Sequence, residues 1–223
     1  HKDRELTRDL VERAESAGYD ALVVTVDTPL LGRRLRDERN GFSLPDGFVM
    51  ANLQSLDGPT DGSMLAKYVA ERHDASFTWA DLAWLRSLSH LPIVLKGIVR
   101  ADDAVRAASE GVAAVIVSNH GGRQLDASPA TLDALPGIAD AVAGRCEVLM
   151  DGGVRSGADV FKAVALGARA VLIGRPVLWG LATGGEDGVF GVLQLFAEDL
   201  SRTMALAGTA TLADIERAMV AIG

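Results

Sequence analysis

Residues 117–126 read VSNHGGRQLD, so an apolar run ends on Ser118, Asn119 and His120 and is followed by two glycines and Arg123. A core strand does not need a histidine at its end, whereas an imidazole placed there can accept a proton from a molecule in a pocket. The Arg123 guanidinium has the planar fork that binds a carboxylate through two parallel hydrogen bonds. The types and spacing of these side chains therefore predict acid–base chemistry on a small carboxylic acid.

Two further charged residues stand at the ends of other apolar runs. Asp27 follows the run at 21–26 and is a candidate to orient the His120 imidazole, as carboxylates do in other histidine-based sites. Lys96 ends the run at 92–96 and supplies a fixed positive charge. A base, an orienting carboxylate, a carboxylate-binding arginine and a spare cation together predict removal of a proton beside a group that accepts electrons.

Two segments rich in glycine and arginine predict a phosphate site. DGGVRSG at 151–157 follows one apolar run and opens a helical pattern, so its backbone amides and Arg155 can bind an anion. IGRP at 173–176 repeats the arrangement, and phosphate sites of β/α barrels are frequently built from the last two loops of this kind. Each motif alone is weak evidence for a phosphate site, and the two together are stronger evidence. The sequence contains neither G-x-G-x-x-G nor a P-loop, which favours a cofactor other than a classical dinucleotide.

Composition and charge argue against several classes of protein. Apolar residues make up 48% and charged residues 23% of the 223, as in ordinary globular proteins, and the net charge of −8 argues against a nucleic-acid partner. The single cysteine, Cys146, excludes an internal disulfide, and the four histidines lack metal-ligand spacing, so no metal is expected. No apolar run reaches the roughly 18 residues of a membrane span, and no signal peptide opens the chain. A soluble, cytoplasmic protein is expected.

Short apolar runs alternate with helical patterns along the chain. The runs are rich in Val and Ile and continuous, which predicts strands buried on both faces of a parallel sheet and an α/β fold with right-handed crossovers. Ligands bind at the carboxyl ends of such strands, and each run ends in a polar or special residue. Helix capping or loop polarity explains any one of these residues better than a site does, but the recurrence at five ends favours a site. The runs lie at 21–26, 92–96, 113–118, 147–150 and 170–174, and the helical patterns at 4–17, 82–88, 101–110, 157–166 and 186–207.

The connection at 28–77 is unusually long for a compact domain, which predicts a lid or an active-site loop. It carries four arginines, and the alternative interpretation of these is a solvated basic face. They are Arg33, Arg34, Arg36 and Arg39.

Several segments closely resemble the FMN-dependent α-hydroxy-acid oxidases and dehydrogenases, the family of glycolate oxidase, lactate oxidase and mandelate dehydrogenase. They are KDR, TVDTPLLGRR, LKG, SNHGGRQLD, MDGGVRSGADVFKAVALGA and IGRP. The resemblance implies one domain over 1–223 with a (β/α)8 TIM-barrel fold, of which this chain holds strands four to eight. It also implies FMN as cofactor and oxidation of a small (S)-2-hydroxy acid to the 2-oxo acid. The first three strands and two N-terminal tyrosines of the family have no counterpart here.

The resemblance also implies roles for individual residues. His120 is the base, Asp27 stabilises its imidazolium, and Arg123 binds the substrate carboxylate with Arg34 close by. Lys96 lies beside the pyrimidine edge of the flavin, where negative charge builds up on reduction. The remaining cofactor contacts implied are Thr25, Ser118, Gly121, Asp151, Gly152, Gly153, Arg155, Gly174 and Arg175.

Five strands cannot close an eight-stranded barrel, so two bare sheet edges and an exposed apolar interior are expected. A homo-oligomer or a complementing N-terminal fragment would cover them. One alternative is a non-catalytic module that binds flavin or phosphate or serves assembly, and a less favoured one is another flavin barrel such as a type-2 isomerase. The residues do not distinguish glycolate, lactate and mandelate, nor oxygen from a quinone or a cytochrome as electron acceptor.

Overall fold

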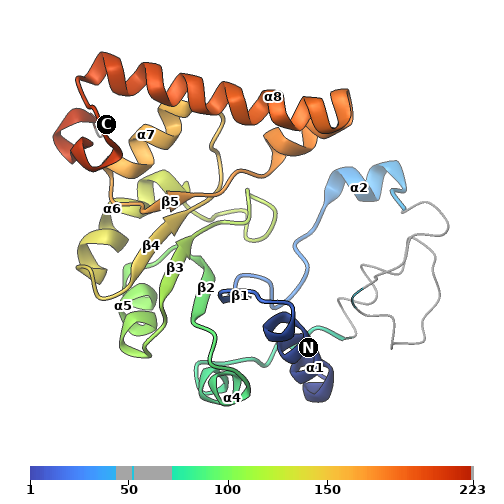
Figure 1. Ribbon diagram of the computed structural model, residues 1–223. Coiled ribbons are helices and arrows are strands. Elements are labelled where there is room, and N and C mark those ends of the chain that lie inside the picture. The colour runs from blue at the N-terminus through green and yellow to red at the C-terminus, as the bar shows by residue number, and fades with distance from the viewer. Residues whose placement is uncertain (44–51, 53–71, 222–223) are drawn as a thin grey trace. The chain divides into compact units, whose positions relative to one another are not determined.

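The computed structural model describes residues 1–43, 52 and 72–221. Their strands form one sheet in the order β1-β2-β3-β4-β5 (Figure 1), and the pairs β2/β3, β3/β4 and β4/β5 are parallel. Within this part of the chain the sheet is open, with β1 and β5 as its edges, as expected for an incomplete barrel. The strands are β1 (Leu22–Thr25), β2 (Ile93–Ile98), β3 (Ala114–Val117), β4 (Glu147–Met150) and β5 (Ala170–Val171).

The helices largely follow the predicted alternation with the strands. The structure differs from the sequence-based prediction in four features: β5 has only two residues, and α2, α6, which encloses Pro136, and the part of α8 before its kink at Gly184 were not predicted. In Figure 1, α5, α6 and α7 lie along one side of β3, β4 and β5. The helices are α1 (Arg4–Ser16), α2 (Leu35–Asn40), α4 (Asp81–Leu88), α5 (Ala101–Ser109), α6 (Thr131–Val142), α7 (Gly157–Ala165) and α8 (Arg175–Ala207), with 3-10 turns at Leu212–Asp214 and Arg217–Met219.

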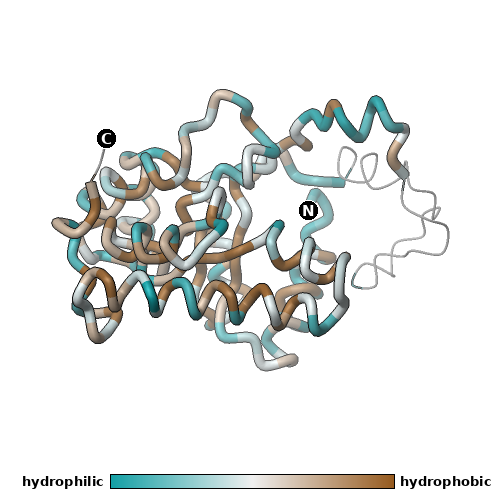
Figure 2. Tube along the Cα trace, turned by 90° about the horizontal axis from the view of Figure 1, so that it is seen from above, coloured by the Kyte–Doolittle hydropathy of each residue, from teal (hydrophilic) through white to brown (hydrophobic). Residues whose placement is uncertain are grey.

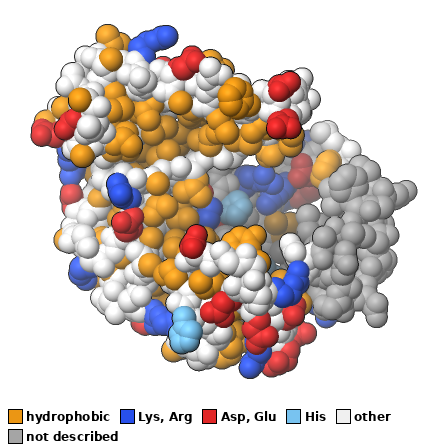
Figure 3. Space-filling view, viewed as in Figure 1, with side chains coloured by type: hydrophobic (Ala, Val, Ile, Leu, Met, Phe, Trp, Pro, Cys, Tyr) orange, Lys and Arg blue, Asp and Glu red, His pale blue; other side chains and the backbone are white. Residues whose placement is uncertain are grey.

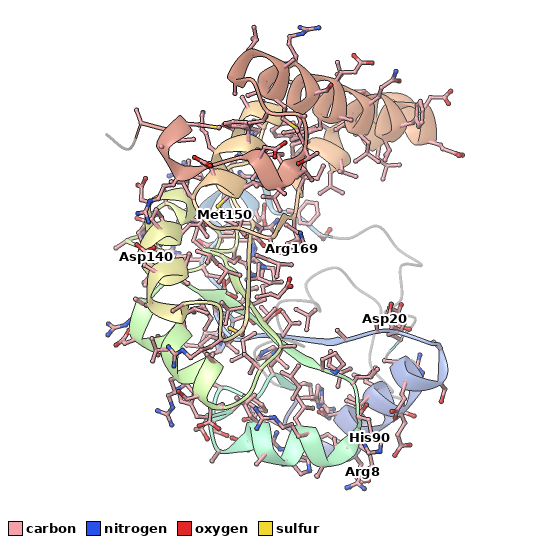
Figure 4. All side chains as sticks on the ribbon, turned by 60° about the vertical axis from the view of Figure 1, so that its left-hand side comes forward. Arg8, Asp20, His90, Asp140, Met150 and Arg169 are labelled. Carbon is pink, nitrogen blue, oxygen red and sulfur yellow. The ribbon has the colours of Figure 1, made fainter. Side chains whose placement is uncertain are left out.

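The chain forms two compact units. The first comprises His1–Leu22 and Thr28–Ile93, and the second Val23–Asp27 and Val94–Gly223. In the described part of the first unit, Arg4 at the start of α1 forms ion pairs with Asp74 at 2.9 Å and Asp81 at 3.0 Å. Its guanidinium also lies 4.6 Å from the centre of the Trp84 ring. Arg4 therefore holds α1 against α4 and the segment before it. Figure 4 shows Arg8 and His90 of this unit pointing outward.

The core of the second unit lies around the central strand. All four residues of β3 are buried, and Leu95 of β2 and Met150 of β4 are only 1% and 2% exposed. Figure 4 shows Met150 directed into this interior. The central strand β3 is therefore covered on both faces, as predicted, whereas the edge strand β1 alternates between half-buried and exposed residues. In Figure 2 the long helix α8 alternates between apolar and polar residues along its length.

Helix α8 is two helical segments joined at a pair of glycines. Gly184 and Gly185 leave the helical conformation, with φ of −147° and 58°, so the second segment begins where the pattern at 186–207 predicts it. The two segments contact each other through Gly180 and Gly188, where a Cβ on Gly188 would lie 2.0 Å from the Gly180 carbonyl oxygen. Only glycine allows this approach, so the pair fixes how the chain folds back on itself.

The second segment of α8 also packs closely against α7. A Cβ on Gly157 would lie 2.0 Å from the backbone nitrogen of Leu200. Beyond α8, the chain ends against the same helices, with Ile215 in a cluster with Phe161. Arg217 donates to both carboxylate oxygens of Asp140 at 2.9 Å, and Figure 4 shows Asp140 on the outer side of α6.

Apolar side chains also reach the surface of α8 (Figure 3). Within the described residues, no helix is both long and apolar enough to span a bilayer. Nor do these residues contain a group of three His, Cys, Asp or Glu side chains arranged to hold a metal ion. The most exposed apolar residues of α8 are Leu178, Trp179, Leu181, Phe190, Leu193, Leu195 and Leu206.

Candidate active site

Four of the predicted chemical side chains come together at one end of the sheet, within the second unit. Asp27 follows β1, Lys96 lies in β2, His120 follows β3 and Asp151 follows β4. In neighbouring parallel strands the carboxyl ends meet at one edge, which is why residues far apart in sequence become neighbours here.

His120 and Asp27 form the central pair. The Nδ1 atom of His120 lies 3.2 Å from Oδ1 of Asp27, and their side chains are 31% and 14% exposed. The carboxylate fixes the orientation of the ring and occupies Nδ1, so the other ring nitrogen, Nε2, is the one left to exchange a proton with a ligand. Oδ2 of Asp27 is buried and has no hydrogen-bond partner among the described residues.

The backbone of His120 is left-handed, with φ of 57°, and Gly121 and Gly122 follow at 67° and 73°. A non-glycine residue in this region costs roughly 1–2 kcal/mol, so the surroundings must hold it in place. The hydroxyl of Ser118 accepts the His120 amide at 3.1 Å, and Oδ1 of Asn119 accepts the two glycine amides at 3.1 and 3.3 Å. Sequence reasoning missed this role of Asn119, although asparagine is typical of such turns.

Lys96 connects the strand ends through two contacts at 2.9 Å. Its ammonium donates to the Ser118 hydroxyl and pairs with Oδ2 of Asp151. Ser118 is completely buried. Its hydroxyl oxygen accepts hydrogen bonds from both the Lys96 ammonium and the His120 backbone amide. The ammonium of Lys96, which extends from β2, is thereby held beside the residues that follow β3 and β4.

Two residues that sequence reasoning did not select hold Asp27 in place. Gly97 has φ of 111°, and a Cβ there would lie 2.7 Å from both Cβ and Cγ of Asp27. The Gln124 side chain donates from Nε2 to the Asp27 carbonyl at 2.9 Å. An isolated glycine inside a strand pattern signals a close approach of backbone, and LKG carries that signal.

The two Gly/Arg loops lie next to the histidine loop. Gly152 approaches it so closely that a Cβ would lie 3.0 Å from Oδ1 of Asn119, and its carbonyl accepts the Thr131 hydroxyl at 3.1 Å. Arg175, in the second loop, donates from Nη2 to the Gly121 carbonyl at 3.0 Å. The loops after β3, β4 and β5 are thereby tied together.

The first turns of α7 and α8 differ in their capping. In α7, the Ala158 amide donates to Asp199 at 3.0 Å and the Asp159 amide to the Ser156 hydroxyl at 3.2 Å. In α8, the N-cap residue Gly174 makes no side-chain cap hydrogen bond. The first turn of α8, which no side chain caps, is therefore a better binding site for an anion than the first turn of α7.

Asp159 anchors the first of these loops. Burial opposes the ionisation of its carboxyl, but hydrogen bonds from the Arg155 amide and the Ser156 hydroxyl, together with Lys162, outweigh that effect and lower its pKa. The Arg155 amide donates to Oδ2 of Asp159 at 3.0 Å. The charged carboxylate thus holds the backbone of Arg155 at the start of α7.

Two of the predicted site residues, Thr25 and Arg123, have no polar side-chain contact with this group among the described residues. Both residues are exposed, and neither side chain forms a hydrogen bond or ion pair with the described residues. Arg34 belongs to the first unit and directly precedes α2. Of the long connection, residues 44–51 and 53–71 lie outside the described part, so its prediction as an active-site loop stays a prediction.

Comparison with known proteins identifies the family. The profile of the FMN-dependent dehydrogenases matches residues 1–222. The chain belongs to this family. It is 57% identical over 221 residues to L-lactate oxidase of Nostoc sp., covering 97% of this chain and 60% of that protein. It is 51% identical over 227 residues to 2-hydroxyacid oxidase 1 of Homo sapiens, covering 99% and 61%.

Solved structures place the fold in the same family. The crystal structure of mandelate oxidase superposes with a TM-score of 0.88 at 49% identity, covering 97% of this chain and 60% of that one. The five-stranded sheet is thus part of the TIM-barrel fold of these FMN-dependent oxidases, as predicted. The chain spans about three fifths of the length of the relatives it matches.

The residues present fit FMN, the cofactor of FMN-dependent dehydrogenases. The uncapped first turn of α8, with Arg175 at its start, provides amides and a cation for a phosphate. Gly152 and Gly153, both with positive φ, let the backbone after β4 approach a ligand closely. Lys96 supplies the positive charge that a flavin gaining electrons requires.

Proposed function

We propose that this chain carries the catalytic residues of an FMN-dependent enzyme that oxidises small (S)-2-hydroxy acids to 2-oxo acids. The observation that carries the proposal is the His120–Asp27 pair, held at 3.2 Å by a strained backbone at the carboxyl ends of the strands. Strain of this kind is typical of sites where position matters more than stability. The relatives named lactate, 2-hydroxyacid and mandelate oxidase support the substrate class.

Each side chain has one task in this proposal. His120 takes a proton from the substrate at Nε2, and Asp27 stabilises the imidazolium that forms. Arg123, whose exposed side chain forms no hydrogen bond or ion pair with the described residues, binds the substrate carboxylate, with Arg34 as a second cation. FMN, when bound, would supply the acceptor for the two electrons and the second proton that leave the substrate.

The remaining residues hold the cofactor. Lys96 balances the charge that a flavin gains, while Thr25, Ser118 and Asp151 bind or support its polar atoms. The glycines of the three loops allow close approach, and the two arginines bind the phosphate. These are Gly121, Gly152, Gly153, Gly174, Arg155 and Arg175. The oxidases among the relatives favour oxygen as the final acceptor over a quinone or a cytochrome, and a cytoplasmic location stays a prediction.

The test is anaerobic bleaching of bound flavin by (S)-lactate, glycolate or (S)-mandelate, compared between the native protein and His120→Asn. Loss of a general base lowers such a rate by roughly 10²–10⁴-fold, while FMN stays bound. His90→Asn is the matched control, because His90 is exposed and lies outside the site. Fast bleaching in His120→Asn would remove the histidine from its assigned role, and a native protein without flavin would overturn the proposal.

One observation favours the alternative of a non-catalytic binding or assembly module. Within the described residues the sheet has open edges at β1 and β5, and Val23 on β1 is 54% exposed. Another copy of the chain or a complementing fragment would cover such an edge. A soluble oligomer that binds flavin but shows no bleaching with any of the three acids would support this second function.

A further inference from the structure

Trp179 contacts the arginine of the first Gly/Arg loop and lies one helical turn after the arginine of the second. Its ring centre is 5.1 Å from the central guanidinium carbon of Arg155. Trp179 also follows Arg175 by four residues in the first segment of α8, and residues so spaced are neighbours on one helix face. The indole therefore contacts Arg155 and shares a helix face with Arg175, although the two arginines come from loops after different strands.

Trp179 is 53% exposed, so one part of its ring contacts Arg155 and the rest reaches the surface. The Arg155 backbone is fixed by Asp159, and one nitrogen of its guanidinium, Nη1, donates to the Val154 carbonyl at 3.0 Å. The guanidinium lies over the indole ring in a cation–π contact, and this contact leaves the other N–H groups available to bind an anion.

We propose that Trp179 is a positioning residue for the phosphate of FMN: its indole holds the Arg155 guanidinium beside the uncapped first turn of α8, where Arg175 begins the helix. The inference rests on the proposed binding of FMN. An arginine held by such a contact loses less side-chain entropy when the phosphate arrives, so the gain appears as affinity for the phosphate end of the ligand. The isoalloxazine end gains nothing from Trp179.

The experiment compares FMN with riboflavin, which lacks the phosphate, by fluorescence titration of the full chain. Trp179→Leu removes the π face and keeps apolar bulk. We expect it to weaken FMN binding by roughly two- to five-fold, the size of an exposed cation–π contact, and to leave riboflavin binding unchanged. Trp179→Phe restores part of the loss, because a smaller aromatic face remains. Leu178→Ala is the control, since Leu178 is 58% exposed and directly precedes Trp179.

A double-mutant cycle with Arg155→Met separates positioning from a general structural effect. If Trp179 acts through Arg155, the double variant binds FMN no more weakly than Arg155→Met alone. Additive losses, or equal losses for FMN and riboflavin, would overturn the inference. Absence of FMN binding in the native protein would overturn it together with the proposed function. Preferential FMN binding without bleaching by a hydroxy acid would remove only the catalytic proposal.

Discussion

Gly97→Ala should damage the His120–Asp27 pair while leaving the rest of the site intact. The new Cβ would lie 2.7 Å from Cβ and Cγ of Asp27 and 2.8 Å from its backbone nitrogen. Carbon atoms in contact are about 3.5–4.0 Å apart, so the end of β1 must move by about 1 Å. Asp27 would move with the end of β1, and this movement would break or reorient its 3.2 Å contact with His120.

Two costs follow from this one methyl group. Alanine at a φ of 111° is strained, which contributes roughly 1–3 kcal/mol to the loss of unfolding free energy. A displacement of about 1 Å at reacting groups lowers a rate by roughly 10²-fold. The bleaching rate should therefore fall far more than the stability alone explains, with FMN still bound because Gly97 contacts none of the Gly/Arg loops among the contacts recorded.

Gly111→Ala is the matched control. Gly111 also has positive φ, at 75°, but nothing lies within 4 Å of an added Cβ. Both variants carry backbone strain, and only Gly97→Ala pushes on Asp27. The assay measures thermal unfolding, FMN affinity and anaerobic bleaching for both variants. Equal bleaching rates in the two would show that the position of Asp27 does not limit the reaction.

Three further predictions concern the supports of the fold and site. Asn119→Ala leaves the two glycine amides after His120 without their acceptor and should lower the unfolding free energy by about 1–3 kcal/mol, measured by urea titration; an unchanged midpoint would contradict it. Arg4→Met removes the ion pair with Asp74 and should lower the thermal midpoint by about 2–4 °C, while a difference that survives in high salt would show that packing, not charge, is responsible. Hydrogen bonds from Ser76, together with Arg4, lower the pKa of Asp74, so its stabilising contribution is present above the unfolded-state value of about 4 and is lost as the pH falls below it. The thermal midpoints of the native protein and Asp74→Asn should converge in acid. A difference between the two midpoints that stays constant down to low pH would refute the predicted direction of the pH dependence.

The strands could be predicted because their signal is local. Runs of Val and Ile bounded by glycine and polar residues are typical of buried parallel strands, and four of the five have nearly the expected bounds. Helix α6 was missed because Pro136 and Gly137 stand inside it and usually indicate a break. Strand β5 was overestimated because pairing with β4, and not composition, decides where it ends.

The candidate site was predictable for side chains that carry chemistry and less so for their supports. His120, Asp27 and Lys96 stand at strand ends, where their types already suggest a role. Gly97 and Gln124 act through contacts with Asp27, about 70 and 97 residues away in sequence, which no local pattern encodes. The resemblance to a family supplied the roles, and the structure adds the contacts that hold those residues in place.

The histidine loop shows why strain and chemistry coincide in this protein. An extended backbone would continue His120 along β3, and a helical one would begin a turn, whereas φ of 57° turns the chain back toward Asp27. Asn119 and Ser118 supply the hydrogen-bond acceptors that offset the strain. Ser118 also accepts a hydrogen bond from Lys96. The order Ser, Asn, His, Gly, Gly therefore follows from one requirement: a side chain with a proton-accepting nitrogen must stand in a conformation that glycine prefers.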